Sequence, residues 1–264
     1  MGRLSLLVTV FFAACASASP ARRPSPSKPA APVPSVYTIP DAGTFTNRQT
    51  WDFSTLSDGA RLPKGLRASK YPVGDTHEYL PRNVFIQGGY LNLRVEGGQT
   101  AQPYRGGEVT TTVSNIKLAS VRTTAIFTET PGVCNGMFFY ASDNQETDIE
   151  WLSDPQSQSN DGTRQLWFEN QAANDNTEKT VKGWQPPADP TNTEHEYRID
   201  WLSDRVRFYV DGEFKWQTTE NVPYTPGSWV FNNWANGDPG WTAGPPAQDA
   251  LFKIKKIDMY YNTA

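Results

Sequence analysis

Short runs in which apolar and polar residues alternate occur along most of the chain, and no segment longer than ten residues shows a clear period of 3.6. A period of two is typical of β-strands with one buried face. Gly88-Gly89 and Asp211-Gly212 lie between such runs and predict tight hairpin turns. Further alternating runs occupy residues 121–129, 135–142, 163–170 and 251–261. The pattern predicts an all-β sandwich or barrel.

The first 36 residues differ in composition from the rest. One arginine precedes an apolar run from Leu4 to Cys15, and the small residues 16–18 follow, which predicts a secretory signal over 1–18. A buried helix and a lipoprotein signal ending at Cys15 are the alternatives. Residues 19–36 are rich in Pro, Ala and Ser and predict a linker or disordered tail. We expect one folded domain over 37–264, with long surface loops at 156–162, 171–192 and 236–249.

Charge and cysteine content exclude several classes of protein. The net charge is -4 although the first 36 residues carry only basic groups, so the folded part is acidic and nucleic acid is an unfavourable partner. No other stretch is apolar enough to cross a membrane. After removal of the signal Cys134 stands alone, so we expect no internal disulfide and interpret Cys134 as a small buried residue.

Three acids alternate with two other residues at 146–150: Glu146, Asp148 and Glu150. On a strand the acids share one face, while Thr147 and Ile149 point to the other. The outer two Cα atoms would be about 13 Å apart, and glutamate side chains that lean together can approach the ~5–5.5 Å separation of retaining glycosidases. Crowding raises the pKa of at least one carboxyl, as a general acid requires. From spacing alone, a solvated acidic face or a calcium site remains an alternative.

The segment GMFFYASDNQETDIEWLS resembles the active-site strand of glycoside hydrolase family 16, in the branch without an extra residue before the last glutamate. Three further blocks are similar to that family: YRGGEVTTT, HEYRIDWLSDRVRFYVDGEF and PGSWVFNNWANGDPGW. The resemblance implies a concanavalin A-like jelly-roll sandwich of two curved antiparallel sheets, and it suggests a fungal source. It also implies that Glu146 is the nucleophile, Asp148 an assisting residue and Glu150 the acid/base.

The resemblance and the aromatic content also provide candidate substrate-binding residues. Glu108, Asn232 and Trp234 match family positions that face substrate, and Trp241 and Trp167 are further candidates for stacking on sugar rings. We expect Trp151, Trp201 and Trp229 in the core, and we interpret His77 and His195 as structural or surface residues. The chain departs from bacterial lichenases at Asn144, Thr147 and Thr110, which argues against strict lichenase specificity.

We therefore predict a secreted, retaining endo-β-glucanase that acts on 1,3/1,4-linked or 1,3-linked β-glucan. A transglycosylase with the same catalytic triplet and a carbohydrate-binding sandwich without catalysis are the alternatives. We expect the reaction to need no cofactor and no catalytic metal. A structural calcium ion away from the active site is compatible with this prediction. We expect a monomer whose partner is the polysaccharide.

Overall fold

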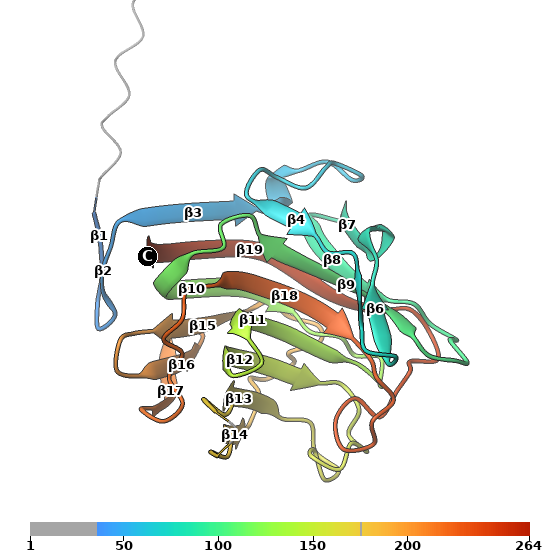
Figure 1. Cartoon of the computed structure of the whole chain (residues 1–264). Coiled ribbons are helices and arrows are strands. Elements are labelled where there is room, and N and C mark those ends of the chain that lie inside the picture. The colour runs from blue at the N-terminus through green and yellow to red at the C-terminus, as the bar shows by residue number, and fades with distance from the viewer. Residues whose placement is uncertain (1–35, 175) are drawn as a thin grey trace, which may run out of the picture. The chain divides into compact units, whose positions relative to one another are not determined.

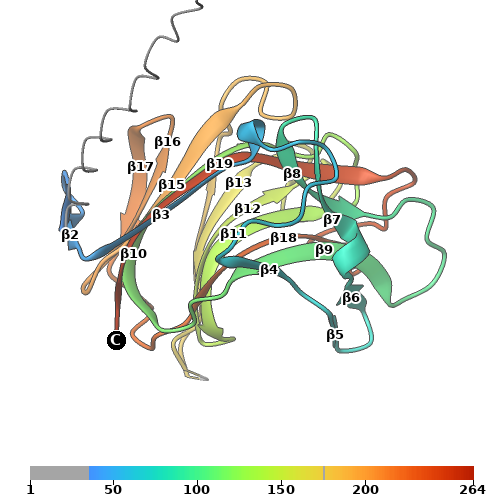
Figure 2. The same cartoon turned by 90° about the horizontal axis from the view of Figure 1, so that it is seen from above.

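Two antiparallel sheets pack face to face in the computed structural model, which describes residues 36–174 and 176–264 (Figures 1 and 2). The predicted signal and nearly all of the predicted linker lie outside the described residues. Within them no α-helix occurs, and the short 3-10 helices η1 (Phe53–Thr55) and η2 (Pro81–Asn83) are the helical segments. No described helix has the length and apolar character needed to span a bilayer.

The first sheet has eight strands in the order β17-β16-β15-β10-β19-β8-β7, with β3 also pairing with β19. Its strands are β3 (Asn47–Asp52), β7 (Val84–Gln87), β8 (Tyr90–Val95), β10 (Ile116–Ile126), β15 (His195–Trp201), β16 (Val206–Val210), β17 (Glu213–Thr218) and β19 (Ala250–Thr263). A separate two-stranded hairpin is formed by β1 (Tyr37–Ile39) and β2 (Gly43–Phe45).

The second sheet has nine strands in the order β14-β13-β12-β11-β18-β9-β6-β5, with β4 also pairing with β9. Its strands are β4 (Leu66–Ala68), β5 (Tyr71–Val73), β6 (His77–Tyr79), β9 (Tyr104–Thr111), β11 (Cys134–Ser142), β12 (Gln145–Leu152), β13 (Leu166–Asn170), β14 (Thr180–Trp184) and β18 (Ser228–Trp234). All pairs are antiparallel except β6 with β9.

The jelly-roll sandwich and both predicted hairpins are confirmed. Gly88 and Gly89 join β7 to β8, and Asp211 and Gly212 join β16 to β17, in each case with positive φ at both residues. Such φ values define the turn that matches the twist of paired strands. The expected loop 171–192 is wrong at β14, since residues 180–184 pair with β13 as an edge strand. Its exposed side chains and Gly183 hide the alternation from the sequence.

The acidic strand β12 is central in its sheet and has one face in the core. Thr147, Ile149 and Trp151 are buried between the sheets, where Trp201 and Trp229 also lie, as expected for these tryptophans. Burying large apolar side chains is the main stabilising contribution to such a sandwich. Because Ile149 and its neighbours fill the core, the alternating carboxylates project from the opposite, outward face of the sheet.

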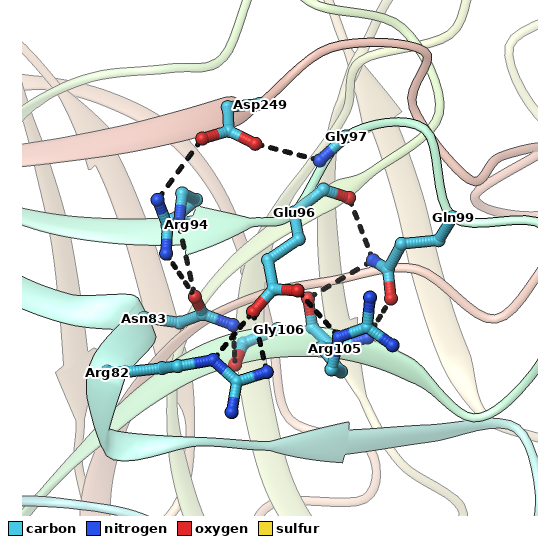
Figure 3. Close-up of polar contacts among 9 residues, drawn as sticks. All are labelled: Arg82, Asn83, Arg94, Glu96, Gly97, Gln99, Arg105, Gly106 and Asp249. Carbon is cyan, nitrogen blue, oxygen red and sulfur yellow. Dashed lines mark hydrogen bonds and ion pairs between the residues drawn. The ribbon is translucent and has the colours of Figure 1, made fainter.

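A polar network joins the two sheets where β8 ends and β9 begins (Figure 3). The Glu96 carboxylate accepts from Arg105 Nε at 2.6 Å and from Arg82 Nε at 2.9 Å. Next to it, Asn83 donates to the Gly106 carbonyl and accepts from Arg94. These contacts fix the start of β9, the strand that carries Glu108.

Replacing Glu96 with glutamine should lower the free energy of unfolding by about 1 kcal/mol, since the two arginines are partly exposed and their ion pairs are screened. Burial raises the pKa of Glu96, but hydrogen bonds from Arg105 and Arg82 outweigh it and the net pKa is lowered. The contribution is therefore present above the ordinary glutamate pKa and is lost as the pH falls through the folded value. Urea unfolding at neutral pH and near pH 3 measures it, and an equal difference at both would contradict it.

Candidate active site

The register of the nine-stranded sheet places the candidate residues in rows on its outward face. Glu150 lies opposite Trp167 on β13 and Gly136 on β11, while Gly136 lies opposite Asn232 on β18, which in turn pairs with Glu108 on β9. Directly paired side chains of antiparallel strands have Cβ atoms about 4.5–5.5 Å apart. One row thus joins the predicted acid/base residue to three of the predicted substrate-binding residues, Trp167, Asn232 and Glu108.

Two cavities meet at Glu146 and Glu150. A cavity of about 430 Å³ extends toward β13 and β14, and a cavity of about 410 Å³ extends toward β9, β5 and β6. Both include Glu146, Glu150 and Trp234 in their walls. A third space of about 590 Å³ shares Tyr71, Glu108 and Tyr140 with the second. The two glutamates therefore sit at the middle of a long hollow on the sheet.

The three carboxyls of β12 differ in exposure and in proton affinity. Glu146 and Glu150 are partly exposed, whereas Asp148 is buried beneath them. Burial raises the pKa of Asp148 well above its usual range, and the charges of Glu146 and Glu150 add to the rise. This rise favours the protonated form of Asp148, whose side chain is hydrogen-bonded to Glu146.

Burial is also the main cause of the raised pKa values of the two outer glutamates. The pKa of Glu146 rises to about 7, opposed by the hydrogen bond from Asp148. The pKa of Glu150 rises to about 8, with the negative charge of Glu169 adding to the effect of burial. The hydrogen bond favours the anionic form of Glu146, which suits a nucleophile. Glu150 retains its proton near neutral pH, which suits a general acid.

Cys134 is buried, as expected, and it has a neighbour that the sequence did not reveal. Its Sγ lies 3.1 Å from Glu150 Oε1. Burial, followed by the charge of Glu150, raises the pKa of the thiol well above its ordinary value. Cys134 therefore remains protonated and donates a weak hydrogen bond that holds the Glu150 carboxylate.

Glu108 and Asn232 lie in the hollow with two tyrosines from β5 and β6. The hydroxyl of Tyr71 donates to Glu108 Oε1 at 2.9 Å, and Asn232 Nδ2 donates to the Tyr79 hydroxyl at 3.0 Å. The buried Asn232 Oδ1 has no hydrogen-bond partner among the described residues. Asn232 thus lies in the wall of the hollow with one acceptor unpaired, and its role in substrate binding stays a prediction.

The three candidate tryptophans differ in position. Trp234 lines both central cavities and stacks on His77 at 5.0 Å between ring centroids, while Trp241 lines the cavity toward β13. Trp167 lies outside the walls of both central cavities, and its ring packs against Trp241 at 5.6 Å between ring centroids. Burial lowers the pKa of His77 to about 4, so a neutral ring supports Trp234.

Several residues of the hollow were not predicted from the sequence. They are Tyr71, Tyr79, Tyr140, Glu169, Gln171 and Lys179. Tyr71 and Tyr79 come from the three-residue strands β5 and β6, which show no clear alternation, and Lys179 lies in the segment expected to be a loop. Alternation offered a signal for Tyr140 on β11 and for Glu169, which shares a face of β13 with Trp167. Among the described residues no group of His, Cys, Asp and Glu is arranged to hold a metal ion, so the structural calcium stays a prediction.

Gly136 leaves space between Glu150 and Asn232, and Gly136→Ala should remove it. An added Cβ would lie 2.5 Å from Asn232 Oδ1, and the Asn232 amide cannot turn away without disturbing the hydrogen bond that its Nδ2 donates to Tyr79. Because small displacements in a reacting geometry cost about 100-fold in rate, we expect kcat/KM on glucan to fall by about that factor with little change in Tm. Ser142→Ala on the same strand is the control, and full activity of Gly136→Ala would contradict this reading of the space.

The sequence of this chain is similar to those of known proteins. Residues 76–252 match the family model described as Glycosyl hydrolases family 16. The chain is 28% identical over 163 residues to a Beta-glucanase of Acetivibrio thermocellus, which covers 58% of this chain and 45% of that protein. The aligned segments span between 19% and 45% of the lengths of the first curated relatives.

Solved structures share the fold at low sequence identity. A prokaryotic β-1,3-1,4-glucanase (lichenase) derived from a mouse hindgut metagenome superposes with a TM-score of 0.64 at 18% identity, over 82% of this chain and 99% of that one. An endo-β-1,3-glucanase from Pyrococcus furiosus gives a TM-score of 0.66 at 17% identity, over 88% and 100% of the chains. Identities this low support the jelly-roll fold alone.

Proposed function

Because the chain belongs to glycoside hydrolase family 16, we propose that it is a retaining endo-β-glucanase that cleaves 1,3/1,4-linked or 1,3-linked β-glucan. The observation that carries the proposal is that Glu146 and Glu150 project from one strand face into both central cavities, with Asp148 hydrogen-bonded to Glu146 between them. The open hollow on both sides of the pair suits cleavage within a polymer. The predicted secretory signal supports action outside the cell.

The reaction proceeds in two displacements. The Glu146 carboxylate attacks the anomeric carbon while the Glu150 carboxyl gives its proton to the leaving glycosidic oxygen. Glu150, now ionised, takes a proton from water, and the resulting hydroxide displaces Glu146 from the glycosyl-enzyme. The hydrogen bond from Asp148 orients Glu146. In the second displacement the same bond stabilises the departing Glu146 carboxylate and makes it a better leaving group. Trp234 and Asn232 hold the sugar against the pair.

The test is a product panel on barley glucan, lichenan, laminarin and xyloglucan, with the anomer of the first product followed by proton NMR. We expect short oligosaccharides from the first three polymers and a β-anomer that appears before mutarotation. Initial release of the α-anomer would contradict the double displacement. Failure to cleave any of these glucans would contradict the proposed activity.

A transglycosylase is the second candidate, because a cavity lined by Trp241 and Gln171 continues on the far side of Glu150. A sugar held there could resolve the glycosyl-enzyme in place of water. Adding a fluorescent oligosaccharide acceptor separates the two activities. Products longer than the acceptor would indicate transfer, and unlabelled short products alone would indicate hydrolysis.

A further inference from the structure

A fourth acid, Glu169, lies next to the catalytic row on β13. It pairs directly with Asp148 across the strands, so it is a diagonal neighbour of Glu146 and of Glu150. Its side chain is only 1% exposed, and it lines the same cavity as the two outer glutamates. Four carboxyls crowded on two adjacent strands would destabilise the sheet unless some charge is compensated.

Lys179 supplies that compensation. Its Nζ lies 2.8 Å from Glu169 Oε2, and Gln171 Nε2 approaches the same oxygen at 3.4 Å. The ammonium also lies 4.8 Å from the centroid of the Trp241 ring, and the side chain stays 42% exposed. The second oxygen of Glu169, Oε1, is buried and has no hydrogen-bond partner among the described residues. The carboxylate is thus held as an anion by one cation at the mouth of the cavity.

We propose that the Glu169–Lys179 ion pair is a positioning pair for the general acid, in which ionised Glu169 keeps the proton on Glu150 and Lys179 keeps Glu169 ionised. The inference rests on the proposed function for the role of Glu150. It adds two residues that act through Glu150 and need not touch the substrate.

The charges around Glu150 support this assignment. Its own strand carries Glu146 and Asp148, and the Cys134 thiol approaches from β11. The other ionisable groups in the walls of its two cavities include Glu108, His77, Asp143 and Asp238. From β18 it meets the uncharged side chains of Asn232 and Trp234. Lys179 is the one lysine or arginine among the described residues that line the two central cavities.

Two opposite effects on Glu150 therefore come from this pair. The negative charge of Glu169 is the largest contribution after burial to the raised pKa of Glu150, and Lys179 opposes it. Burial also raises the pKa of Glu169 itself, against the pull of Lys179. Without Lys179, Glu169 would take up a proton and the pair would stay neutral.

The experiment is a double-mutant cycle of Glu169→Gln, Lys179→Met and both together. Its readouts are the alkaline limb of kcat/KM and, independently of activity, the titration of Glu150 by NMR with ¹³C-labelled glutamate. Glu169→Gln leaves an uncompensated cation, so we expect the pKa of Glu150 and the limb to move about one pH unit lower. Lys179→Met and the double variant should also titrate below wild type, but by less than Glu169→Gln, because each lacks the negative charge of Glu169 and also the opposing charge of Lys179. Glu150→Gln assigns the NMR signal.

Several results would overturn the inference. An unmoved Glu150 titration in Glu169→Gln, or in the double variant, would show that the pair has only a structural role. Should Glu169→Gln not fold, the ¹³C titration of Glu169 in Lys179→Met decides: its pKa should rise by about one unit, and no rise refutes the coupling. The distant pair Lys255–Glu194, also at 2.8 Å, provides the control variant Lys255→Met. If the wild-type protein did not cleave glucan, only the proposed function would be contradicted, because the NMR titration of Glu150 would still test the Glu169–Lys179 pair.

Discussion

Glu146→Ala should lower sugar release from β-glucan by at least about four orders of magnitude, because no other group in the hollow can take its place at the anomeric carbon. Losses of this size are typical when the nucleophile of a catalytic unit is removed. Binding of oligosaccharides should persist, since Trp234, Asn232 and Glu108 remain in the hollow. Initial rates on lichenan and laminarin, together with calorimetric binding of a glucan oligosaccharide, measure the two effects.

A chemical rescue makes this expectation sharper. Sodium azide should enter the space left by the Glu146 side chain and form an α-glycosyl azide, since it attacks from the side of the missing carboxylate. Glu213→Ala, an exposed residue on β17, is the matched control and should keep full activity. Unchanged sugar release by Glu146→Ala would refute the assignment of the nucleophile and with it the proposed mechanism.

Glu150→Ala should lower the rate on polymeric glucan by about 10²–10⁴-fold, the usual contribution of general acid catalysis. The first step should be nearly unaffected on an aryl glucoside whose phenol leaves without protonation. This dependence on the leaving group separates Glu150 from Glu146, whose loss stops both substrates. A pre-steady-state burst of phenol from Glu150→Ala would support the role, whereas equal losses on both substrates would contradict it.

The pH dependence gives a second readout of Glu150. The carboxyl must be protonated to act as the acid, so activity should fall as the pH rises through its pKa, which burial and Glu169 raise to about 8. Because Glu150 interacts with neighbouring carboxyls, the alkaline side of the pH–activity profile reports the titration of the whole group. In Glu150→Ala this alkaline limb should disappear on the aryl glucoside, while the acid limb of Glu146 remains.

The sequence allows the acidic face of β12 to be predicted because alternation is a local property of a strand. Glu146 and Glu150 share a face whatever the rest of the chain does, and the Gly88-Gly89 and Asp211-Gly212 turns are equally local. The predicted roles of these residues remain to be tested by the variants above.

The remainder of the site depends on contacts between segments that are distant in sequence. Cys134 approaches Glu150 because β11 pairs with β12 in one register, and a shift of one residue would turn its sulfur into the core. Tyr71 reaches Glu108 only through the short strands β5 and β6, which have no alternation to reveal them. Lys179 meets Glu169 because β14 adds to the sheet edge beside β13. The periodicity of a single segment cannot predict such contacts between segments.

The position of β19 has a consequence for synthesis of the chain. This strand, at residues 250–263, pairs with β3, β8 and β10 and fills the middle of its sheet. Until it leaves the ribosome, β10 and β8 have no shared neighbour and one side of the sandwich is open. The domain therefore cannot complete its folding until residues 250–263 have left the ribosome, and a stop before residue 250 would leave β8 and β10 without their common partner.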